Sequence, residues 1–389
     1  MKRLLQGSPR EVIWRWLFIL LMAGGLYATY VRVVHGLGAS TNLSDTFPWG
    51  LWIGFDVLCG VGLAAGGFTL AAIVHVFNIE RYKPILRATI LTAFLGYLLV
   101  ILALLFDLGR SYRIWHPLVM WNPRSVMFEV AWCVVLYTTV LALEFVPVLL
   151  ERLGWRTPLG WMRAVALPLV IAGVILSTLH QSSLGSLYLI VPYKLNPLWY
   201  TPLLPVFFFL SALCVGFAMV IFESQQSSRA FGRQLELPLL ASMGRVLAVL
   251  LMFYLLVRFL DLRHRGVLGL LAEARTETYL FVLEILLMLA PMLLLFRLRV
   301  RLSAGWLYAC AVMVIFGFVT NRLNVSITGM EASSGVHYVP RWTEVMITLS
   351  IIAVGFAIFR LAAKHLPIFE EEKSALAPLP VVGSAVPAD

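Results

Sequence analysis

The sequence predicts an all-α polytopic membrane protein with about ten transmembrane helices in a single transmembrane domain, residues 1–369. Of its 389 residues, 61% are hydrophobic and 13% are charged. That is more apolar side chain than a soluble core of this length can bury. Windows of about 20 mostly apolar residues, the length that crosses roughly 30 Å of hydrocarbon, recur from Val12 almost to His365.

The first helix follows a basic segment and has no small-residue cleavage site, so we expect it to be retained and not to be a signal peptide. The next five helices begin near Pro48, Pro84, Pro123, Pro158 and Pro202. The last four are placed by their apolar windows. The predicted helices cover 12–35, 50–77, 85–108, 124–150, 160–180, 202–224, 238–260, 276–298, 303–322 and 342–365.

The net charge of +10 comes from Lys and Arg in short loops beside the apolar windows, which indicates membrane topology and not nucleic-acid binding. One set of alternate loops is richer in these residues, from Lys2 and Arg3 to Arg360 and Lys364. We therefore predict that both termini are cytoplasmic. After Phe369 the sequence turns acidic and then rich in Ala, Pro and Val, which predicts a disordered cytoplasmic tail at 370–389.

Metal and haem sites are not expected. The cysteines, Cys59, Cys133, Cys214 and Cys310, stand singly in apolar windows, so they cannot together form an iron–sulfur cluster or zinc site. Haem b usually needs paired histidines on facing helices. The histidines within or at the ends of helices are His35 at an outer end, His75 at an inner end and His180, and they form no good pair at one depth.

A faint internal repeat relates the third and fourth helices to the seventh and eighth. Asp107-Leu108-Gly109-Arg110 ends the third and Asp261-Leu262-Arg263 ends the seventh. Glu129 and Glu284 follow these aspartates at similar distances in the sequence. Parallel repeats and chance similarity between apolar helices both account for the pattern.

Ionisable side chains inside a helix bundle are expensive to bury and are functional candidates by default. Those expected near the outer face, from four helices at one depth, are Asp56, Asp107, Arg110, Glu129, His180 and Gln181. Glu129 lies one turn into its helix, and His180 is expected at the outer end of the fifth helix. The sequence therefore predicts an outer polar pocket. A structural Asp107–Arg110 ion pair is the alternative for those two residues.

A possible proton path leads inward from this pocket. Glu144 follows Glu129 on one helix at a separation of about 22 Å, and Glu223 lies near the inner end of the sixth helix. With Tyr97 these carboxyl groups could carry protons toward the cytoplasm. Alternatively, Glu144 and Glu223 lie in the inner interface beside arginines.

Several motifs resemble the polysulfide reductase membrane-subunit (NrfD-like) family and, within it, the integral membrane subunits of hydrogenase-2 type nickel–iron hydrogenases. The resemblance covers nearly the whole chain apart from both tails. Its motifs are Phe47-Pro48-Trp49-Gly50-Leu51-Trp52-Ile53-Gly54-Phe55-Asp56, His180-Gln181-Ser182-Ser183-Leu184-Gly185, Glu151-Arg152-Leu153-Gly154-Trp155, Asn196-Pro197-Leu198-Trp199, Ile221-Phe222-Glu223 and Pro340-Arg341-Trp342-Thr343-Glu344.

The resemblance implies two four-helix bundles with additional helices in a bacterial inner membrane. It also implies a haem-free subunit that is not catalytic alone and passes electrons from a periplasmic ferredoxin-like four-cluster iron–sulfur subunit to menaquinone or ubiquinone. The hydrogenase case adds nickel–iron large and small subunits as partners, with membrane lipid around the chain. Coupling to proton translocation is expected, and Glu129, His180 and Glu223 occupy matching motif positions.

A quinone needs hydrogen-bonding groups, a titratable residue and apolar walls. We expect Glu129 and His180 to carry the chemistry, with Trp52, Asp56, Asp107, Arg110, Gln181 and Ser182 as quinone-binding residues. Candidate walls are Trp49, Trp52, Phe55, Trp115, Trp121 and Phe128, although an interfacial tryptophan belt is the simpler explanation for most. Other functions left open are a subunit of a molybdenum enzyme or multihaem cytochrome complex, a proton-coupled transporter and a structural anchor.

Overall fold

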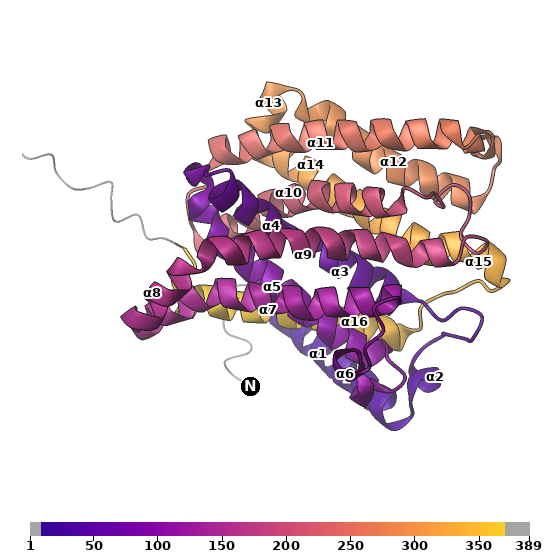
Figure 1. Ribbon diagram of the computed structural model, residues 1–389, viewed down its shortest axis with the longest axis horizontal. Helices are drawn as coiled ribbons and strands as arrows, with labels where there is room; N and C mark the ends of the chain where they lie inside the picture. Colours follow the sequence, from indigo (N-terminus) through magenta and orange to yellow (C-terminus); the bar gives the residue numbers. More distant parts are fainter. Residues whose placement is uncertain (1–8, 370–389) are drawn as a thin grey trace, which may run out of the picture.

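The computed structural model describes residues 9–369, and within them every regular element is helical. Ten of these helices are long and apolar enough to cross a membrane, and they run side by side (Figure 1). The all-α fold predicted from the sequence is confirmed. The predictions for Lys2, Arg3 and the tail at 370–389 lie outside the described residues.

Eight spans are built on single long helices: α1 (Pro9–Val34), α5 (Lys83–Asp107), α7 (Val126–Leu153), α9 (Ala166–Ser186), α10 (Leu204–Phe231), α11 (Leu237–His264), α12 (Thr276–Leu295) and α16 (Trp342–His365). The second span joins η2 (Trp52–Val57), α3 (Leu58–Leu63), α4 (Gly66–Ala71) and η3 (Ala72–Val76). The ninth joins α14 (Ala304–Leu323), η8 (Asn324–Thr328) and α15 (Gly329–Ser334). The connections carry α2 (Leu37–Ser40), η4 (Glu80–Tyr82), η5 (Ser111–Arg113), α6 (His116–Val119), α8 (Arg156–Ala164), η6 (Leu187–Ile190), η7 (Val267–Ala272) and α13 (Leu298–Arg301).

The spans form two four-helix bundles with a flanking pair. The first bundle contains the second span, α5, α7 and α9, and the second contains α10, α11, α12 and α14. Helix α10 packs on both α9 and the second span and so joins the bundles, while α1 and α16 pack together beside α5 (Figure 1). The two ends are named here the Glu129 end, where α2, α6 and α15 lie, and the α8 end.

Two spans continue beyond their predicted ends because their polar side chains form hydrogen bonds inside the helix. The fifth was expected to end at residue 180, but α9 reaches Ser186, so His180 lies inside the span. Ser182 and Ser183 donate back to the carbonyls of Thr178 and Leu179, at 2.9 and 2.8 Å. The ninth span likewise runs past residue 322.

The second span is interrupted at Ala64–Ala65. The Ala65 N–H donates to Gly62 at 2.9 Å, so it is not available to the carbonyl of Val61, four residues before it. Close packing accompanies the break, since a Cβ at Gly216 in α10 would lie 3.1 Å from the Ala65 carbonyl oxygen. A carbonyl freed in this way in the interior of a membrane protein must find another donor.

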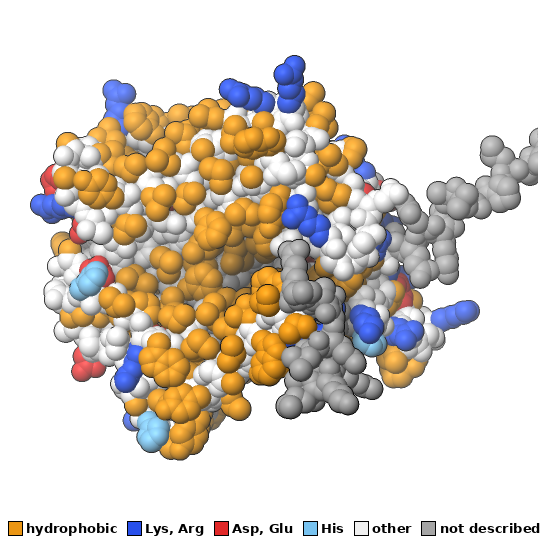
Figure 2. Space-filling view, turned by 180° about the vertical axis from the view of Figure 1, so that it is seen from behind, with side chains coloured by type: hydrophobic (Ala, Val, Ile, Leu, Met, Phe, Trp, Pro, Cys, Tyr) orange, Lys and Arg blue, Asp and Glu red, His pale blue; other side chains and the backbone are white. Residues whose placement is uncertain are grey.

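Hydrophobic and basic side chains occupy different parts of the surface. Hydrophobic side chains cover the broad middle of the face shown in Figure 2, and Lys and Arg side chains gather at its periphery. This distribution is typical of a protein whose middle meets lipid tails and whose ends meet water.

Glu344 joins three segments at the Glu129 end. This fully buried carboxylate accepts the N–H groups of Asn42 and Arg341, at 2.8 and 3.0 Å, and a short hydrogen bond from Tyr338. The Tyr338 hydroxyl in turn accepts the N–H of Leu51 at 2.9 Å. Burial, and then the bond to the carboxylate, raise the pKa of Tyr338, so it remains a donor at neutral pH.

Replacing Tyr338→Phe should lower the thermal unfolding midpoint in detergent. The change removes the partner of the Leu51 N–H and of Glu344, and each buried group left unpaired costs about 1–3 kcal/mol. The matched control is Tyr193→Phe, at a side chain that is 96% exposed. Equal midpoints for the two variants would contradict a stabilising role for this network.

Candidate functional site

His180 and Tyr97 form the centre of a polar cluster in the first bundle. His180 is fully buried in α9, and its Nδ1 atom lies 2.9 Å from the hydroxyl of Tyr97 in α5. Tyr97 packs edge-on against Tyr137 of α7, with ring centroids 4.8 Å apart. The Nε2 atom of His180 is buried without a hydrogen-bond partner in the described part of the chain. A hydroxyl donating to Nδ1 would leave the proton on Nε2, which makes that nitrogen an available donor.

Gln181 connects this cluster to the interrupted second span. Its Nε2 atom donates to the carbonyl of Val61 at 3.2 Å, the carbonyl that the break at Ala64–Ala65 frees. Its Oε1 atom is buried and has no partner among the described residues. One side chain therefore fixes the break and keeps a buried acceptor atom without a partner in the described part of the chain.

Glu129 opens the cluster to the surface. It lies in the first turn of α7, where Ser125 caps the helix, and it is exposed. The buried Ser183 hydroxyl lies 2.5 Å from its Oε1 atom and 2.8 Å from the Leu179 carbonyl, and it donates to one of them at a time. Ser183 follows His180 by three residues, so the two side chains lie about one turn apart on one face of α9.

An aromatic cluster flanks Glu129. Trp121 packs against Phe128 and Trp132, with ring centroids 5.0 Å apart in both pairs. Trp132 was not among the sequence candidates, although it follows Phe128 by four residues and therefore shares its helix face. Trp121 is exposed, so this wall faces the membrane surface.

The polar face of α9 continues inward from His180. Ser177 is buried, and a Cβ at Gly173 would lie 3.4 Å from Oε1 of Glu144 and 3.7 Å from the Tyr137 ring. From Ser183 to Gly173 this face spans about 15 Å along the helix axis. It places Glu144, on α7, further along the same line of polar groups.

Glu223 lies beside the break in the second span. Oε2 of Glu223 is 3.4 Å from the hydroxyl of Thr89 in α5. A cavity of about 10 Å³, bordered by Glu223, Thr92, Ala64 and Gly67, adjoins it. That volume is close to the minimum of about 10–15 Å³ that one water molecule needs.

The other predicted quinone-binding residues form a separate group or stand apart. Trp52 is fully buried and donates to the Glu344 carbonyl at 3.3 Å, and Asp56 accepts from Thr348 of α16 at 2.7 Å. Both thus face α16, and the single predicted pocket is divided. Asp107 makes no ion pair with the exposed Arg110, so the alternative of an Asp107–Arg110 pair is wrong.

Two further assignments need adjustment. Arg32 of α1, which the sequence analysis missed, donates to the carbonyls of Phe106 and Leu108 at the end of α5, at 2.6 and 2.8 Å. Ser182 bonds back to its own helix, whereas Ser183 contacts Glu129. The three-residue spacing from His180 was the signal that could have identified Ser183.

The second bundle holds a sealed polar network around Glu284. This buried carboxylate accepts from Trp199, Asn321 and Asn324, at 2.9, 2.8 and 3.0 Å. Arg322 donates to Oδ1 of Asn321 at 2.7 Å, and its guanidinium carbon lies 3.6 Å from the Phe208 ring centroid. These polar residues lie inside an apolar window, and that position is the signal that could have identified them.

The two clusters correspond through the internal repeat. Asn321, Arg322 and Asn324 repeat the spacing of His180, Gln181 and Ser183. In both bundles the last residue of the set contacts a glutamate, Glu129 or Glu284. In both, the middle residue donates to a carbonyl of the bundle's first helix, Val61 or Phe208. This agreement favours a true repeat over chance similarity.

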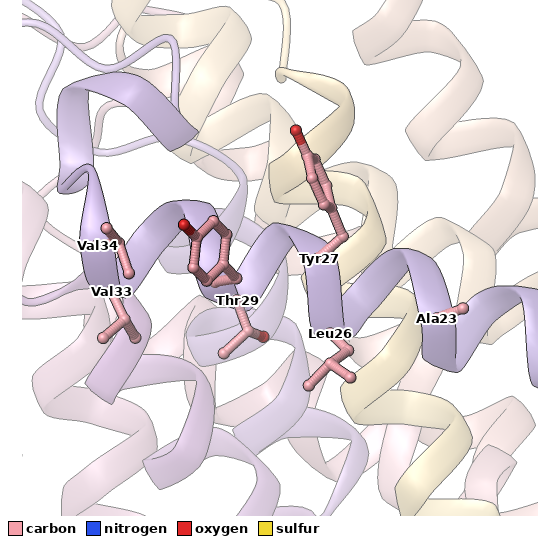
Figure 3. A pocket seen from close by; sticks show the side chains of 7 residues that line it. Ala23, Leu26, Tyr27, Thr29, Val33 and Val34 are labelled. Carbon is pink, nitrogen blue, oxygen red and sulfur yellow. The ribbon is translucent and has the colours of Figure 1, made fainter.

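A large hollow lies elsewhere, on α1. It is an open groove of about 570 Å³ along Ala23, Leu26, Tyr27, Val33 and Val34, whose side chains Figure 3 shows along one helix. Tyrosine hydroxyls are its only titratable groups. The residues that line this groove therefore include no side chain that takes up or releases a proton near neutral pH.

Similarity to known proteins adds to this geometry. A family model described as polysulphide reductase, NrfD, matches residues 39–332. An Escherichia coli protein named "Probable Ni/Fe-hydrogenase 2 b-type cytochrome subunit" is 36% identical over 87% of this chain and 87% of its own. The "Menaquinone reductase, integral membrane subunit" of Nitratidesulfovibrio vulgaris is 29% identical over 93% and 92%. A selenate reductase subunit of Mesobacillus selenatarsenatis is 28% identical over 51% and 52%.

The name of the Escherichia coli relative implies a haem, and the described residues do not fit one. Haem b is usually held by two axial histidines on facing helices. His180 is the only buried histidine among the seven of the chain, all of which lie within residues 9–369, and its Nδ1 faces Tyr97. The absence of a resident haem stays a prediction.

Replacing Arg322→Met should lower the thermal unfolding midpoint strongly. The variant removes the buried cation that donates to Asn321, a partner of Glu284, and breaking such a buried charge network costs about 3–5 kcal/mol. Arg263→Met, at an exposed arginine near the end of α11, is the matched control and should change the midpoint little. Similar midpoints for the two variants would mean that the network does not stabilise the second bundle.

Proposed function

Because the chain belongs to the NrfD polysulphide reductase family, we propose that it is the quinone-reactive membrane subunit of an oxidoreductase complex whose partner enzyme is a nickel–iron hydrogenase. The observation that carries the proposal is the cluster on α9. Exposed Glu129 contacts the buried Ser183 of α9, and His180, three residues before Ser183 on the same helix, contacts Tyr97. A surface carboxylate backed by a buried imidazole is suited to proton exchange with a lipid-soluble substrate.

Reduction of a quinone to a quinol takes two electrons and two protons. The electrons come from the partner's iron–sulfur clusters, and this chain supplies the protons. Glu129 gives a proton at the quinone oxygen, and His180 with Tyr97 replaces it from the interior. Trp121, Phe128 and Trp132 provide the apolar wall against which the ring lies.

The wider polar groups divide into two roles. Gln181 positions α9 against the second span, and its buried Oε1 atom has no partner among the described residues. Trp52 and Asp56 act at a distance from Glu129 by holding the second span against α5 and α16. Quinone contact by Trp52 is disfavoured because its side chain is only 1% exposed.

Protons reach the cluster from the α8 end by two branches. One follows Tyr137, Ser177 and Glu144 along α7 and α9. The other follows Thr92, Thr89 and Glu223 along α5, where the small cavity has room for about one water. The second bundle supplies no equivalent path, because Asn321 occupies the position equivalent to His180. An amide side chain does not take up or release a proton at neutral pH.

The partner is a periplasmic ferredoxin-like iron–sulfur subunit with four clusters, joined to the large and small hydrogenase subunits in a bacterial inner membrane. The Escherichia coli relative favours this partner. A second candidate has support of its own, because relatives are named as subunits of menaquinone, selenate and tetrathionate reductases. In that case the quinone chemistry is the same, and a different enzyme exchanges the electrons.

His180→Ala and Glu129→Gln should each lower quinone reduction by about a hundredfold or more, the usual contribution of a positioned acid or base. The assay uses membranes carrying the assembled complex, hydrogen as the donor and a menaquinone analogue as the acceptor. Hydrogen-dependent reduction of an artificial dye reports on the partner subunits alone and should not change. Glu277→Gln, in the first turn of α12, is the matched carboxylate control.

The outcomes separate the parts of the proposal. Full quinone reduction by both variants would make Glu129 and His180 structural. If hydrogen reduces neither acceptor in wild-type membranes, the hydrogenase partner is wrong and another electron donor must be used to test the quinone site.

Glu223→Gln should preserve quinone reduction while reducing the proton movement that accompanies it in liposomes. The amide cannot take up and release a proton at the cavity between α5 and α10. Glu236→Gln, at an exposed glutamate that precedes α11, is the control. Unchanged charge movement per quinone in the Glu223 variant would remove Glu223 from the path.

A further inference from the structure

Helix α8 differs from its neighbours because it is short and amphipathic and lies beyond the end of the first bundle (Figure 1). Helical spacing places Arg156, Gly160 and Arg163 on one face and Pro158 and Met162 on the opposite one. Pro158 and Met162 are half-buried, and α8 contacts α7 and α9. On the basic face Arg156 is exposed, while Arg163 reaches Glu151 of α7 at 3.2 Å.

Two tryptophans place α8 at the depth of the membrane interface. Trp155 precedes α8 and is 58% exposed, and Trp161 within it is 70% exposed. Indole rings prefer the boundary between lipid headgroups and acyl chains. A short helix with exposed tryptophans and an arginine face thus has the character of an interfacial helix.

The arginines around α8 outnumber the acids. Glu151 is already shared by Arg87 at 2.9 Å and Arg163 at 3.2 Å. Arg152 and Arg156 are both exposed, and within residues 9–369 no carboxylate pairs with either. Among the described residues, two positive charges beside two interfacial tryptophans are therefore without an acidic partner.

We propose that Arg152 and Arg156, with Trp155 and Trp161, bind the phosphate headgroup of an anionic phospholipid. Arginine forks match phosphate oxygens in two-point hydrogen bonds. The tryptophans favour a lipid over free phosphate because only a lipid brings acyl chains to their rings. Helix α8 connects α7 to α9, so the bound lipid braces the two helices that carry Glu129 and His180.

The test compares wild type with Arg152→Gln/Arg156→Gln, each as the full complex in nanodiscs of phosphatidylcholine and phosphatidylglycerol. Native mass spectrometry of the released complex counts the phosphatidylglycerol that stays bound. The affinity for phosphatidylglycerol should fall about thirtyfold, which is the factor expected when two arginines near an anionic surface are lost. The control is Arg297→Gln/Arg299→Gln, which removes the same charge from exposed arginines before and within α13 of the second bundle.

Unfolding midpoints provide a second measurement. Phosphatidylglycerol should raise the midpoint of wild type and of the control but not that of the α8 variant, while all three should agree in pure phosphatidylcholine. The proposal is overturned if the α8 variant retains phosphatidylglycerol as wild type does. It is equally overturned if the control loses as much lipid, since that result would indicate general charge attraction, or if inorganic phosphate alone displaces the bound lipid.

Discussion

The hydrogen bond from Gln181 to the carbonyl of Val61 is the contact on which the candidate site depends. A membrane interior supplies no water to an exposed backbone carbonyl, so the break at Ala64–Ala65 is tolerated only where another group replaces the lost donor. Gln181 makes that replacement at 3.2 Å and so fixes α9 against the second span. With α9 in this position, the side chain of His180 points toward Tyr97 and that of Ser183 toward Glu129. The same break borders the cavity beside Glu223.

The two bundles show how one repeated framework can hold two kinds of polar centre. In the first, the glutamate is exposed and its neighbours include a titratable imidazole with a free nitrogen. In the second, Glu284 is 1% exposed and is satisfied by three donors, and the cation is a guanidinium that stays charged. Proton exchange needs access to the surface and a side chain that can take up and release a proton, so the first centre suits chemistry and the second suits stability.

A redox subunit explains these features better than the alternatives of a transporter or a simple anchor. A proton-coupled transporter would place its acids around a substrate cavity between the repeats, whereas the cavity next to Glu223 has a volume of about 10 Å³. A simple anchor gives no reason for buried polar atoms that lack a partner among the described residues, such as Nε2 of His180 and Oε1 of Gln181.

The sequence by itself determined the ten spans, because burying about 20 apolar residues in lipid is a local requirement that each window meets alone. It also identified Glu129, His180, Tyr97 and Glu223 as intramembrane polar groups. Only the tertiary structure decided which of these meet. Ser183 and not Ser182 contacts Glu129, and Trp52 and Asp56 face α16, because helix rotation is fixed by packing between distant segments. The predicted helices ended at His180 and Arg322, but Ser182 bonds back to its own helix and Arg322 donates to Ser211 of α10, so both spans continue inside the bundles.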